Sequence, residues 1–301
     1  MHYGTPASLE EVEPYYTHIR RGRAPSPEQL QDLIDRYKLI GGPSPLAEIS
    51  HKQGEGIQRG LKKRGIETRL YIGAKHSKPF VGEVVKQMAE DGIDETLAVV
   101  LAPHFSGFSI AQYKEYATKA RDESKPDMAI HFLDRWGTLP ELIQALAERV
   151  TDQMQGWTKE ETVVIFSAHS LPEKILTAGD PYKEELLETA QLVANKLSLP
   201  NWRFAFQSAS QTGEPWLGPD ILDVINDIAA EGKFKKVISC TVGFVSDHLE
   251  VRFDLGIEAR ERCLELGLDF RLAGCINDDE CVMDGVAGLL AALVPSVHTH
   301  A

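Results

Sequence analysis

The chain has 301 residues and an ordinary globular composition, 43% hydrophobic and 26% charged, which argues against a disordered or fibrous protein. Its formal net charge of −13 argues against nucleic acid or an anionic membrane surface as a partner, although a basic pocket on an acidic protein can still bind a small anion. No apolar run approaches the ~20 residues of a membrane span, and no basic-then-apolar leader opens the sequence. We therefore expect a soluble, cytoplasmic protein of about two domains.

Apolar segments typical of strands alternate along the chain with longer segments of helical periodicity. The predicted elements, in chain order, are helix 45–64, strand 70–72, helix 79–91, strand 97–102, helix 110–121, strand 130–133, helix 139–154, strand 163–166, helix 182–197, strand 204–206, helix 220–231, strand 237–242, helix 254–266 and helix 280–293. Three of the strands are nearly continuous apolar runs, which is typical of parallel strands covered on both faces. The alternation predicts an α/β fold with helices on both faces of parallel sheets.

The polar segment 151–161, which contains Gly156, precedes a new strand and is the candidate hinge. We expect two similar doubly wound domains with a cleft between them. Residues 1–150 would form the N-terminal domain, with the C-terminal helix 280–301 packing back on it. Residues 151–279 would form the C-terminal domain and carry the metal site.

Several predicted strands end in polar, turn-forming sequence that contains histidine. These strand ends are 73–76, 103–106, 167–172 and 243–250. Ligands of open parallel sheets bind beyond the carboxyl ends of the strands, so we expect these ends to share one site. The segment 167–172 lacks the Gly-x-Ser-x-Gly elbow of a serine hydrolase. The glycines at 41–42 lack the Lys-Ser/Thr of a phosphate-binding loop, and no Gly-x-Gly-x-x-Gly follows a strand, so nucleotide binding has little support.

His169 and Glu250 follow two strands of the second half. An imidazole and a carboxylate suit Fe(II) or a similar divalent ion, and two protein ligands leave coordination positions open. Taken alone, His169 is as readily a structural histidine. Three- and four-residue steps place an acidic series on one helix face, where it is either a solvated surface or a track that attracts cations: Glu250, Asp254, Glu258, Glu261 and Glu265.

A compact cationic and aromatic group lies near the N-terminus. It is either a surface cluster or a site that recognises carboxylates, which arginine forks suit. Its members are Tyr3, Arg20, Arg21, Arg23, Arg36, Tyr37 and Ser44.

The four cysteines form no Cys-x-x-Cys pair, and a disulfide framework does not fit a cytosolic chain of this length. They are interpreted as buried or partly exposed thiols, with an iron–sulfur site built by three of them as the alternative. They are Cys240, Cys263, Cys275 and Cys281.

Motifs spread over the whole chain resemble those of ferrochelatases, and the Gram-positive type best. His-Ser-Leu-Pro at 169–172 and Gly-Phe-x-x-Asp-His-Leu-Glu at 243–250 are the most specific pair. The other matching segments are 3–6, 15–23, 35–46, 101–106, 167–168, 179–182, 206–208 and 216–219. One departure is that the family's first strand, expected before Tyr3, is missing.

The resemblance implies insertion of Fe(II) into a porphyrin with release of two protons, and soluble Gram-positive members use coproporphyrin III. It implies Fe2+ as a substrate and no permanent cofactor; the cysteines do not reproduce the family's iron–sulfur pattern, so no cluster is expected. It also implies no membrane insertion, a monomer, and transient contacts with neighbouring enzymes of haem synthesis. By motif, the resemblance assigns iron binding to His169 and Glu250 and places Tyr3 on the opposite face of the macrocycle. It assigns the outer cation site to Asp254 and Glu258 and a place near the pocket mouth to Lys75 and His76. The porphyrin contacts that it implies are Arg20, Arg36, Tyr37, Ser44 and Tyr113.

We expect His169, assisted by Glu250, to take the pyrrole proton, and the two side chains to face each other across a cleft wide enough for a flat macrocycle. Three alternatives stay open. The porphyrin is protoporphyrin IX, the protein is a tetrapyrrole carrier without catalysis, or it is a cobalt or nickel chelatase that uses His248.

Overall fold

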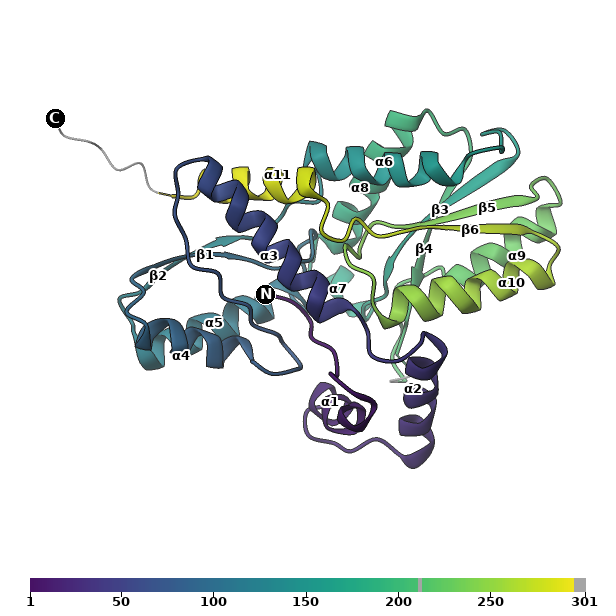
Figure 1. The fold of residues 1–301 in the computed structure, drawn as a ribbon. Coiled ribbons are helices and arrows are strands. Elements are labelled where there is room, and N and C mark those ends of the chain that lie inside the picture. Colours follow the sequence, from purple (N-terminus) through teal and green to yellow (C-terminus); the bar gives the residue numbers. More distant parts are fainter. Residues whose placement is uncertain (211–212, 295–301) are drawn as a thin grey trace.

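The computed structural model describes residues 1–210 and 213–294, which form two parallel sheets surrounded by helices (Figure 1). The first sheet contains β1 (Glu95–Val99) and β2 (Ala129–Leu133). The second sheet has the order β4-β3-β5-β6, all parallel. Its strands are β3 (Thr162–His169), β4 (Trp202–Gln207), β5 (Lys236–Thr241) and β6 (Asp269–Ala273). The predicted α/β class with parallel sheets flanked by helices is confirmed.

Strand β3 is the central strand of the second sheet, with hydrogen-bonded neighbours at both edges. Ser167 pairs with Ala205 of β4 on one side and with Thr241 of β5 on the other. Every residue from Thr162 to Ala168 is buried, as expected for an apolar parallel strand covered on both faces. His169 is the last residue of this strand, directly after its buried part.

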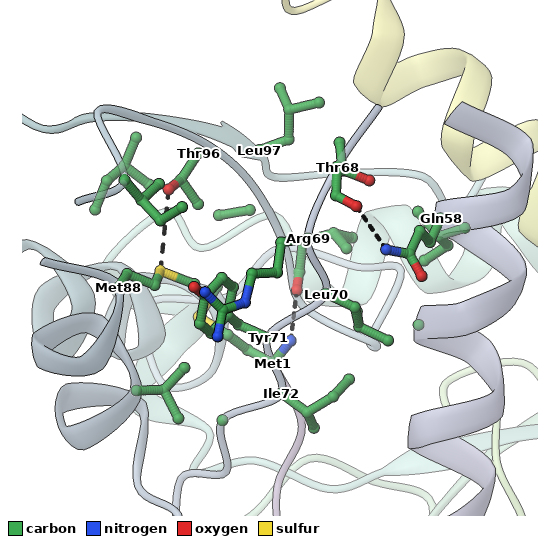
Figure 2. A pocket seen from close by; sticks show the side chains of 18 of the residues that line it. Met1, Gln58, Thr68, Arg69, Leu70, Tyr71, Ile72, Met88, Thr96 and Leu97 are labelled. Atoms are coloured by element: carbon green, nitrogen blue, oxygen red, sulfur yellow. Dashed lines mark hydrogen bonds between the residues drawn. The ribbon is translucent and has the colours of Figure 1, made fainter. Parts of the chain in front are cut away.

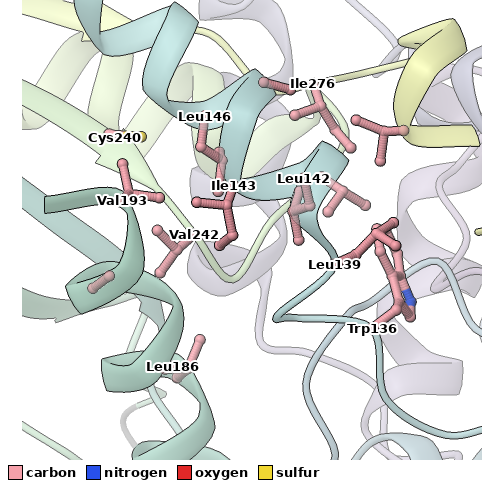
Figure 3. Close-up of a cluster of buried hydrophobic side chains, with 14 of the residues drawn as sticks. Trp136, Leu139, Leu142, Ile143, Leu146, Leu186, Val193, Cys240, Val242 and Ile276 are labelled. Carbon is pink, nitrogen blue, oxygen red and sulfur yellow. The ribbon is translucent and has the colours of Figure 1, made fainter. Parts of the chain in front are cut away.

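Two layers of helices cover the second sheet (Figure 1). One layer contains α6 (Pro140–Gln153) and α8 (Tyr182–Leu197), and the other contains α9 (Ile221–Glu231) and α10 (Arg260–Glu265). Figure 3 shows Leu142 and Leu146 of α6 in the same buried cluster as Leu186 and Val193 of α8. This close-packed interior fixes the strand ends that carry the site.

The first sheet packs against α4 (Val81–Glu90), α5 (Ile110–Ser124), α3 (Leu46–Lys63) and α11 (Glu280–Ala291). Helices α3 and α11 run side by side in close contact, because a Cβ on Gly60 would lie only 2.6 Å from the Cβ of Ala287. Helix α6, from the first half of the sequence, thus covers the second sheet, and α11, from the second half, contacts the first sheet. The division at residue 150 stays a prediction, and of the segment 280–301 the residues 295–301 lie outside the described chain.

Two predicted elements are wrong. Residues 70–72 form no strand, because a strand needs a hydrogen-bonded ladder and β1 is paired only with β2 in the described chain. The predicted helix 254–266 is divided into a π-helix at Val251–Ala259, labelled η2, and the short α10. Such wide turns are frequent at functional sites.

Some elements of the fold were not predicted: α1 (Val12–Ile19), α2 (Pro27–Leu39), β6, the single-turn α7 (Lys174–Thr177) and the 3₁₀ turn η1 (Leu9–Glu11). The start of α2 carries a full sequence signal, since Ser26 and Gln29 form a capping box around Pro27. No helix in residues 1–210 or 213–294 is long and apolar enough to cross a membrane.

Candidate active site

His169 is positioned by hydrogen bonds on both sides of its own backbone and ring. Its carbonyl accepts a hydrogen bond of 3.0 Å from the hydroxyl of Tyr182, at the start of α8. Its Nδ1 is hydrogen-bonded to the carbonyl of Ser170. Because a carbonyl can only accept, Nδ1 carries the proton, and in the neutral ring the lone pair is on Nε2. That nitrogen points toward Glu250.

Glu250 precedes η2 and stands beside two histidines. Its Oε2 lies 3.6 Å from Nε2 of His169 and 3.8 Å from Nε2 of His248. Both distances exceed a normal hydrogen bond, and this buried oxygen has no hydrogen-bond partner among the described residues. Nδ1 of His248 is 2.9 Å from the Ser246 carbonyl, so its Nε2 also presents a lone pair when the ring is neutral. Each imidazole is thus close to the same carboxylate oxygen, although the three side chains do not make up a three-ligand metal site in the described structure.

The pKa values of the neighbouring carboxyl groups of Glu250 and Asp254 are shifted in opposite directions. Burial alone would raise the pKa of Glu250, but the nearby His169 and His248 lower it to about 2. For Asp254, burial and then the charge of Glu250 raise the pKa to about 7. Glu250 is therefore ionised at neutral pH, whereas Asp254 exchanges a proton near neutrality.

Asp254 connects η2 to the N-terminal helices. Its Oδ2 is hydrogen-bonded to the hydroxyl of Ser208, and its Oδ1 lies 3.8 Å from Nη1 of Arg36 on α2. The Arg36 guanidinium also stacks 4.7 Å from the ring centre of Phe253. Burial raises the pKa of Glu258, which Arg36 opposes. The residues predicted for porphyrin contact and for the outer cation site thus meet at Arg36.

The acidic series is only partly one group. Glu250, Asp254 and Glu258 influence one another electrostatically along η2. Glu265 belongs to α10, where it accepts a hydrogen bond of 2.9 Å from Arg262. The prediction of one continuous helical face is wrong for Glu265, because the π-helix ends at Ala259.

The expectation that His169 and Glu250 face each other across a space for a macrocycle is wrong. An aromatic ring needs about 3.5–4.0 Å to its contact atoms on each side, and the two side chains are 3.6 Å apart. They stand side by side, 28% and 31% exposed, so a flat ligand can lie only against the pair.

Tyr3 belongs to a second group of residues, and the charge of Glu250 acts on its hydroxyl. Its ring packs 4.6 Å from the ring of His76. Burial and then the charge of Glu250 raise the pKa of its hydroxyl. Burial likewise raises the pKa of Tyr37, which is 2% exposed, to about 12. Both phenols are therefore neutral donors at physiological pH.

Lys75 and His76 are fixed to the N-terminal residues by main-chain hydrogen bonds. Their amides donate to the carbonyls of His2 and Tyr3, at 2.9 Å each. Burial, reinforced by Arg21, lowers the pKa of Lys75 to about 8, and its Nζ lies 5.5 Å from the ring centre of Tyr113. Burial and Lys75 lower the pKa of His76 to about 3.

Two predicted substrate residues form hydrogen bonds with residues close to them in the chain. Arg20 donates to the carbonyl of Arg23 at 3.3 Å and stacks on Tyr16. The hydroxyl of Ser44 accepts from the amide of Leu46 at 3.2 Å, at the start of α3. No contact of these two side chains with the His169–Glu250 pair is present in the described structure.

Comparison with known proteins decides the family. A family model described as Ferrochelatase matches residues 1–293. The chain belongs to the ferrochelatase family. A ferrochelatase-family protein named Coproporphyrin III ferrochelatase, from Geobacillus sp. (strain WCH70), is 44% identical over 292 residues, covering 95% of this chain and 94% of its own. A relative with the same name from Halalkalibacterium halodurans is 46% identical over 275 residues (90% and 88%), and a Ferrochelatase from Herpetosiphon aurantiacus is 40% identical over 288 residues (94% of each).

Solved structures support the chelatase-like fold of this ferrochelatase-family chain. SirB from Bacillus subtilis with Fe3+ has a TM-score of 0.60 at 14% identity, covering 81% of this chain and 90% of its own. CbiX, described as the terminal enzyme for biosynthesis of siroheme in denitrifying bacteria, has a TM-score of 0.55 at 14% identity, covering 83% and 94%. At such low identity the likeness concerns the fold alone.

Three residues that surround the pair in this ferrochelatase-family chain were not predicted to belong to the site with Fe(II). His248 was considered only for the cobalt or nickel alternative, although it flanks Glu250. Phe244 packs edge-on against His169 and His248, with ring centres 6.1 and 4.3 Å away. Tyr182 supports the backbone of His169. All three lie inside the quoted motifs 179–182 and 243–250, so the motifs themselves were the missed signal.

Proposed function

We propose that the protein inserts Fe(II) into coproporphyrin III and thereby makes Fe-coproporphyrin for haem synthesis. The observation that carries the proposal is the close pair of His169 Nε2 and Glu250 Oε2, 3.6 Å apart, in which the buried carboxylate oxygen has no hydrogen-bond partner in the described part of the chain. The names of the Geobacillus and Halalkalibacterium relatives supply the porphyrin. Iron is a substrate in this reaction.

The macrocycle lies against the His169–Glu250 pair, with Tyr3 on its other face. Fe(II) is held by imidazole nitrogen and carboxylate oxygen, two ligand types that suit this ion and leave positions for the pyrrole nitrogens. Two pyrrole N–H protons leave as Fe2+ enters, which balances the charge. Nε2 of His169 releases Fe(II) to the pyrrole nitrogens before it accepts one of these protons, and ionised Glu250 stabilises the imidazolium that forms, while the second proton passes to solvent.

Cationic and phenolic side chains hold the propionates of the macrocycle. Lys75, with a pKa of about 8, is largely charged at neutral pH, and Tyr37 and Tyr113 remain neutral hydrogen-bond donors. Four propionates favour such a donor-rich surface more than two do. The other proposed porphyrin contacts are Arg20, Arg36, Ser44 and His76.

Asp254 and Glu258 form the proposed outer cation site. Both carboxyl groups have raised pKa values, because of burial in the first place. A divalent ion beside them would displace the proton from Asp254 and thereby lower its pKa. In this role the two residues attract hydrated Fe(II) toward Glu250.

Anaerobic metallation with purified variants tests the proposal. The protein is mixed with Fe(II) and either coproporphyrin III or protoporphyrin IX, and the absorbance change on metallation gives the rate. We expect His169→Ala to lower the rate by about 10²–10⁴-fold, the usual contribution of a general base, while fluorescence quenching still reports porphyrin binding. Glu250→Gln keeps the shape of the side chain and should give a loss of similar order.

Two variants at a distant, exposed pair of side chains serve as matched controls. His51→Ala and Glu55→Gln change an exposed pair on α3, 3.4 Å apart, and should keep full activity. Near-full activity of His169→Ala would refute the assignment. Equal rates with both porphyrins would contradict coproporphyrin specificity, and metallation of neither would favour a carrier.

A second candidate, insertion of cobalt or nickel, is favoured by one observation, the second imidazole beside Glu250. Yet no group of three or more His, Cys, Asp or Glu side chains able to hold a metal occurs within the described residues. The same assay with Co(II) and Ni(II) distinguishes the candidates. A faster rate with either ion than with Fe(II), lost in His248→Ala, would favour the alternative.

The proposal extends to the setting of the enzyme. It acts in the cytoplasm as a monomer, without a permanent cofactor or an iron–sulfur cluster, and makes transient contacts with neighbouring enzymes of haem synthesis. All four cysteines are free thiols, and burial raises the pKa of Cys240 and Cys263 to about 12, which makes them poor metal ligands. Light scattering and the iron content of the purified protein test the monomer and the missing cluster.

A further inference from the structure

The first sheet borders a cavity at one edge and is hydrogen-bonded to the second half of the chain at its carboxyl end. The cavity, of about 300 Å³, lies between Leu97 of β1 and the segment 67–73 (Figure 2), and β1 has no strand neighbour there in the described chain. The loop that follows β1 is held by α8, which covers the second sheet, because Glu185 accepts a hydrogen bond of 2.8 Å from the amide of Phe105. Helix α8 therefore contributes to fixing this loop relative to the second sheet.

Asp180, two residues before α8, holds the same loop with one of its carboxylate oxygens. Its Oδ2 accepts hydrogen bonds from the hydroxyl of Ser106, at 3.0 Å, and from the amide of Gly107, at 2.7 Å. Ser106 is fully buried, and its hydroxyl oxygen also accepts from the amide of Phe108 at 3.1 Å. The loop 105–109 is thus fixed to Asp180 by a buried side chain and by its main chain.

This loop leads directly to two of the proposed porphyrin contacts. The carbonyl of Phe108 accepts from Nζ of Lys75 at 3.5 Å, and the carbonyl of Ser106 accepts from the amide of Ala111 in the first turn of α5 at 3.2 Å. Tyr113 belongs to the same turn, and its ring centre is 5.5 Å from Nζ of Lys75. The position of the loop therefore affects where a porphyrin would be held.

The other oxygen of Asp180 acts on the second sheet. Its Oδ1 accepts a hydrogen bond of 3.0 Å from the amide of Tyr182, the first residue of α8, where a carboxylate is also favoured by the helix dipole. The hydroxyl of Tyr182 donates to the carbonyl of His169 at 3.0 Å. One carboxylate thus connects the loop 105–109 with the strand end that carries His169.

We propose that Asp180 is a positioning residue of the metallation reaction, because it fixes His169 relative to the bound macrocycle. One of its oxygens acts on His169 through Tyr182, and the other acts on the loop 105–109. The inference rests on the proposed function, since it concerns the distance between the proton acceptor and the porphyrin. An error of about 1 Å in such a distance can lower a rate by about 100-fold, so Asp180 affects the reaction without touching porphyrin or Fe(II).

Steady-state kinetics with Fe(II) and coproporphyrin III under anaerobic conditions test this role. We expect Asp180→Asn to lower kcat by about tenfold and to change KM by less than about threefold, because the amide nitrogen cannot accept the hydrogen bond of the oxygen it replaces. Glu185→Gln is the matched control, since this carboxylate holds the same loop and Arg135 but makes no printed contact with Tyr182 or His169 in the described chain. It should raise KM and keep kcat within about twofold of the wild type.

Double variants test whether Asp180 acts through Tyr182. Tyr182→Phe removes the hydroxyl that holds the carbonyl of His169. Two side chains that act along one path have losses that do not multiply, so Asp180→Asn with Tyr182→Phe should lose no more than about twice as much kcat as the worse single variant. The losses of Glu185→Gln and Tyr182→Phe should multiply.

The ring of His169 reports its position without turnover. In protein that carries isotope-labelled histidine, the ring nitrogen signals of His169 are identified in the NMR spectrum by their loss in His169→Ala. We expect these signals to shift in Asp180→Asn and in Tyr182→Phe and to stay unchanged in Glu185→Gln. If the wild type metallates neither porphyrin, the proposed function fails, and the ring signals alone then decide whether Asp180 positions His169.

Unchanged kcat together with unchanged ring signals in Asp180→Asn would overturn the proposal, whatever the melting temperature of the variant. Multiplying losses in the double variant with Tyr182→Phe would overturn it as well. If Asp180→Asn does not fold, Ser106→Ala removes only one of the donors to the same carboxylate and should lower kcat by about threefold, with a shift of the same ring signals. No change in either measurement for Ser106→Ala would then count against the role of Asp180.

Discussion

The two sheets of this molecule differ in how completely their central strands are paired. Strand β3 has a hydrogen-bonded neighbour at each edge and apolar helices on both faces, whereas β1 has one neighbour and a cavity at its other edge. The two side chains that must keep a fixed mutual geometry, His169 and Glu250, both follow strands of the complete sheet. Tyr3, by contrast, follows the short stretch that pairs with Ala74 beside the incomplete one. The proposed metal pair thus follows the sheet whose central strand is paired at both edges, and Tyr3 lies beside the sheet that has two strands in the described chain.

The largest expected effect comes from removing matched side chains in the two sheets. Ile165 of β3 is fully buried, so Ile165→Ala should cost about 2–5 kcal/mol in the free energy of unfolding. Leu97 of β1 is only partly buried and already borders the cavity, so Leu97→Ala should cost about 1 kcal/mol. Urea denaturation measures both. Equal losses would show that the two sheets are equally well packed and would contradict the comparison.

The same contrast explains how much of the fold could be predicted from sequence. Five strands were predicted from their apolar and β-branched composition, and the signal is clearest for β3, which is buried from Thr162 to Ala168. The predicted strand 70–72 failed because its composition suits a strand but no strand of the described chain pairs with it. Local sequence specifies what a segment prefers, whereas a ladder needs a neighbour from another part of the chain. Helix α2 was missed despite its capping box because its apolar face is narrow, with only Tyr37 buried.

The candidate site shows a similar limit. The strand-end argument brought His169 and Glu250 into one site before any coordinates, because parallel strands share one carboxyl edge. It did not predict their order in space, and the idea of a macrocycle between them was wrong. The distance between the two side chains depends on the path of the segment 242–249 between β5 and Glu250, which the local sequence pattern does not specify. The pairing of Arg36 with Asp254, which joins α2 to η2, was equally beyond local sequence.

The buried carboxyl group of Asp254 on η2 should make the free energy of unfolding depend on pH. The pKa of Asp254 is raised from its ordinary value of 3.8 to about 7 by burial and by Glu250, so the folded state binds a proton that the unfolded state has released. Its favourable contribution is full below pH 4 and is lost as the pH rises toward 7. Between pH 4.5 and 6.5 the wild type should lose about 2 kcal/mol relative to Asp254→Asn, at about 1 kcal/mol per pH unit.

Urea denaturation of wild type and Asp254→Asn at several pH values measures this difference. The control is Asp152→Asn, which changes an exposed carboxyl group on α6 and should follow the wild type at each pH. A constant difference between wild type and Asp254→Asn across the range would show that Asp254 is already ionised in the folded protein at pH 4.5.

The smallest expected effect concerns the ion pair between α11 and the end of α3, two helices that lie beside the first sheet. Arg64, just after α3, forms two hydrogen bonds with Asp284, of 3.0 and 2.9 Å, but both side chains are about one-third exposed. Solvent screens such a pair, so Arg64→Met should cost only about 0.5 kcal/mol, and added NaCl should shrink the loss. Arg59→Met is the matched control, because Arg59 is more exposed and lies 3.9 Å from Glu280. A loss above about 2 kcal/mol for Arg64→Met would mean that the first sheet depends on this one contact far more than its partly exposed setting implies. Helix α11 would then be the main support of the first sheet beside the cavity.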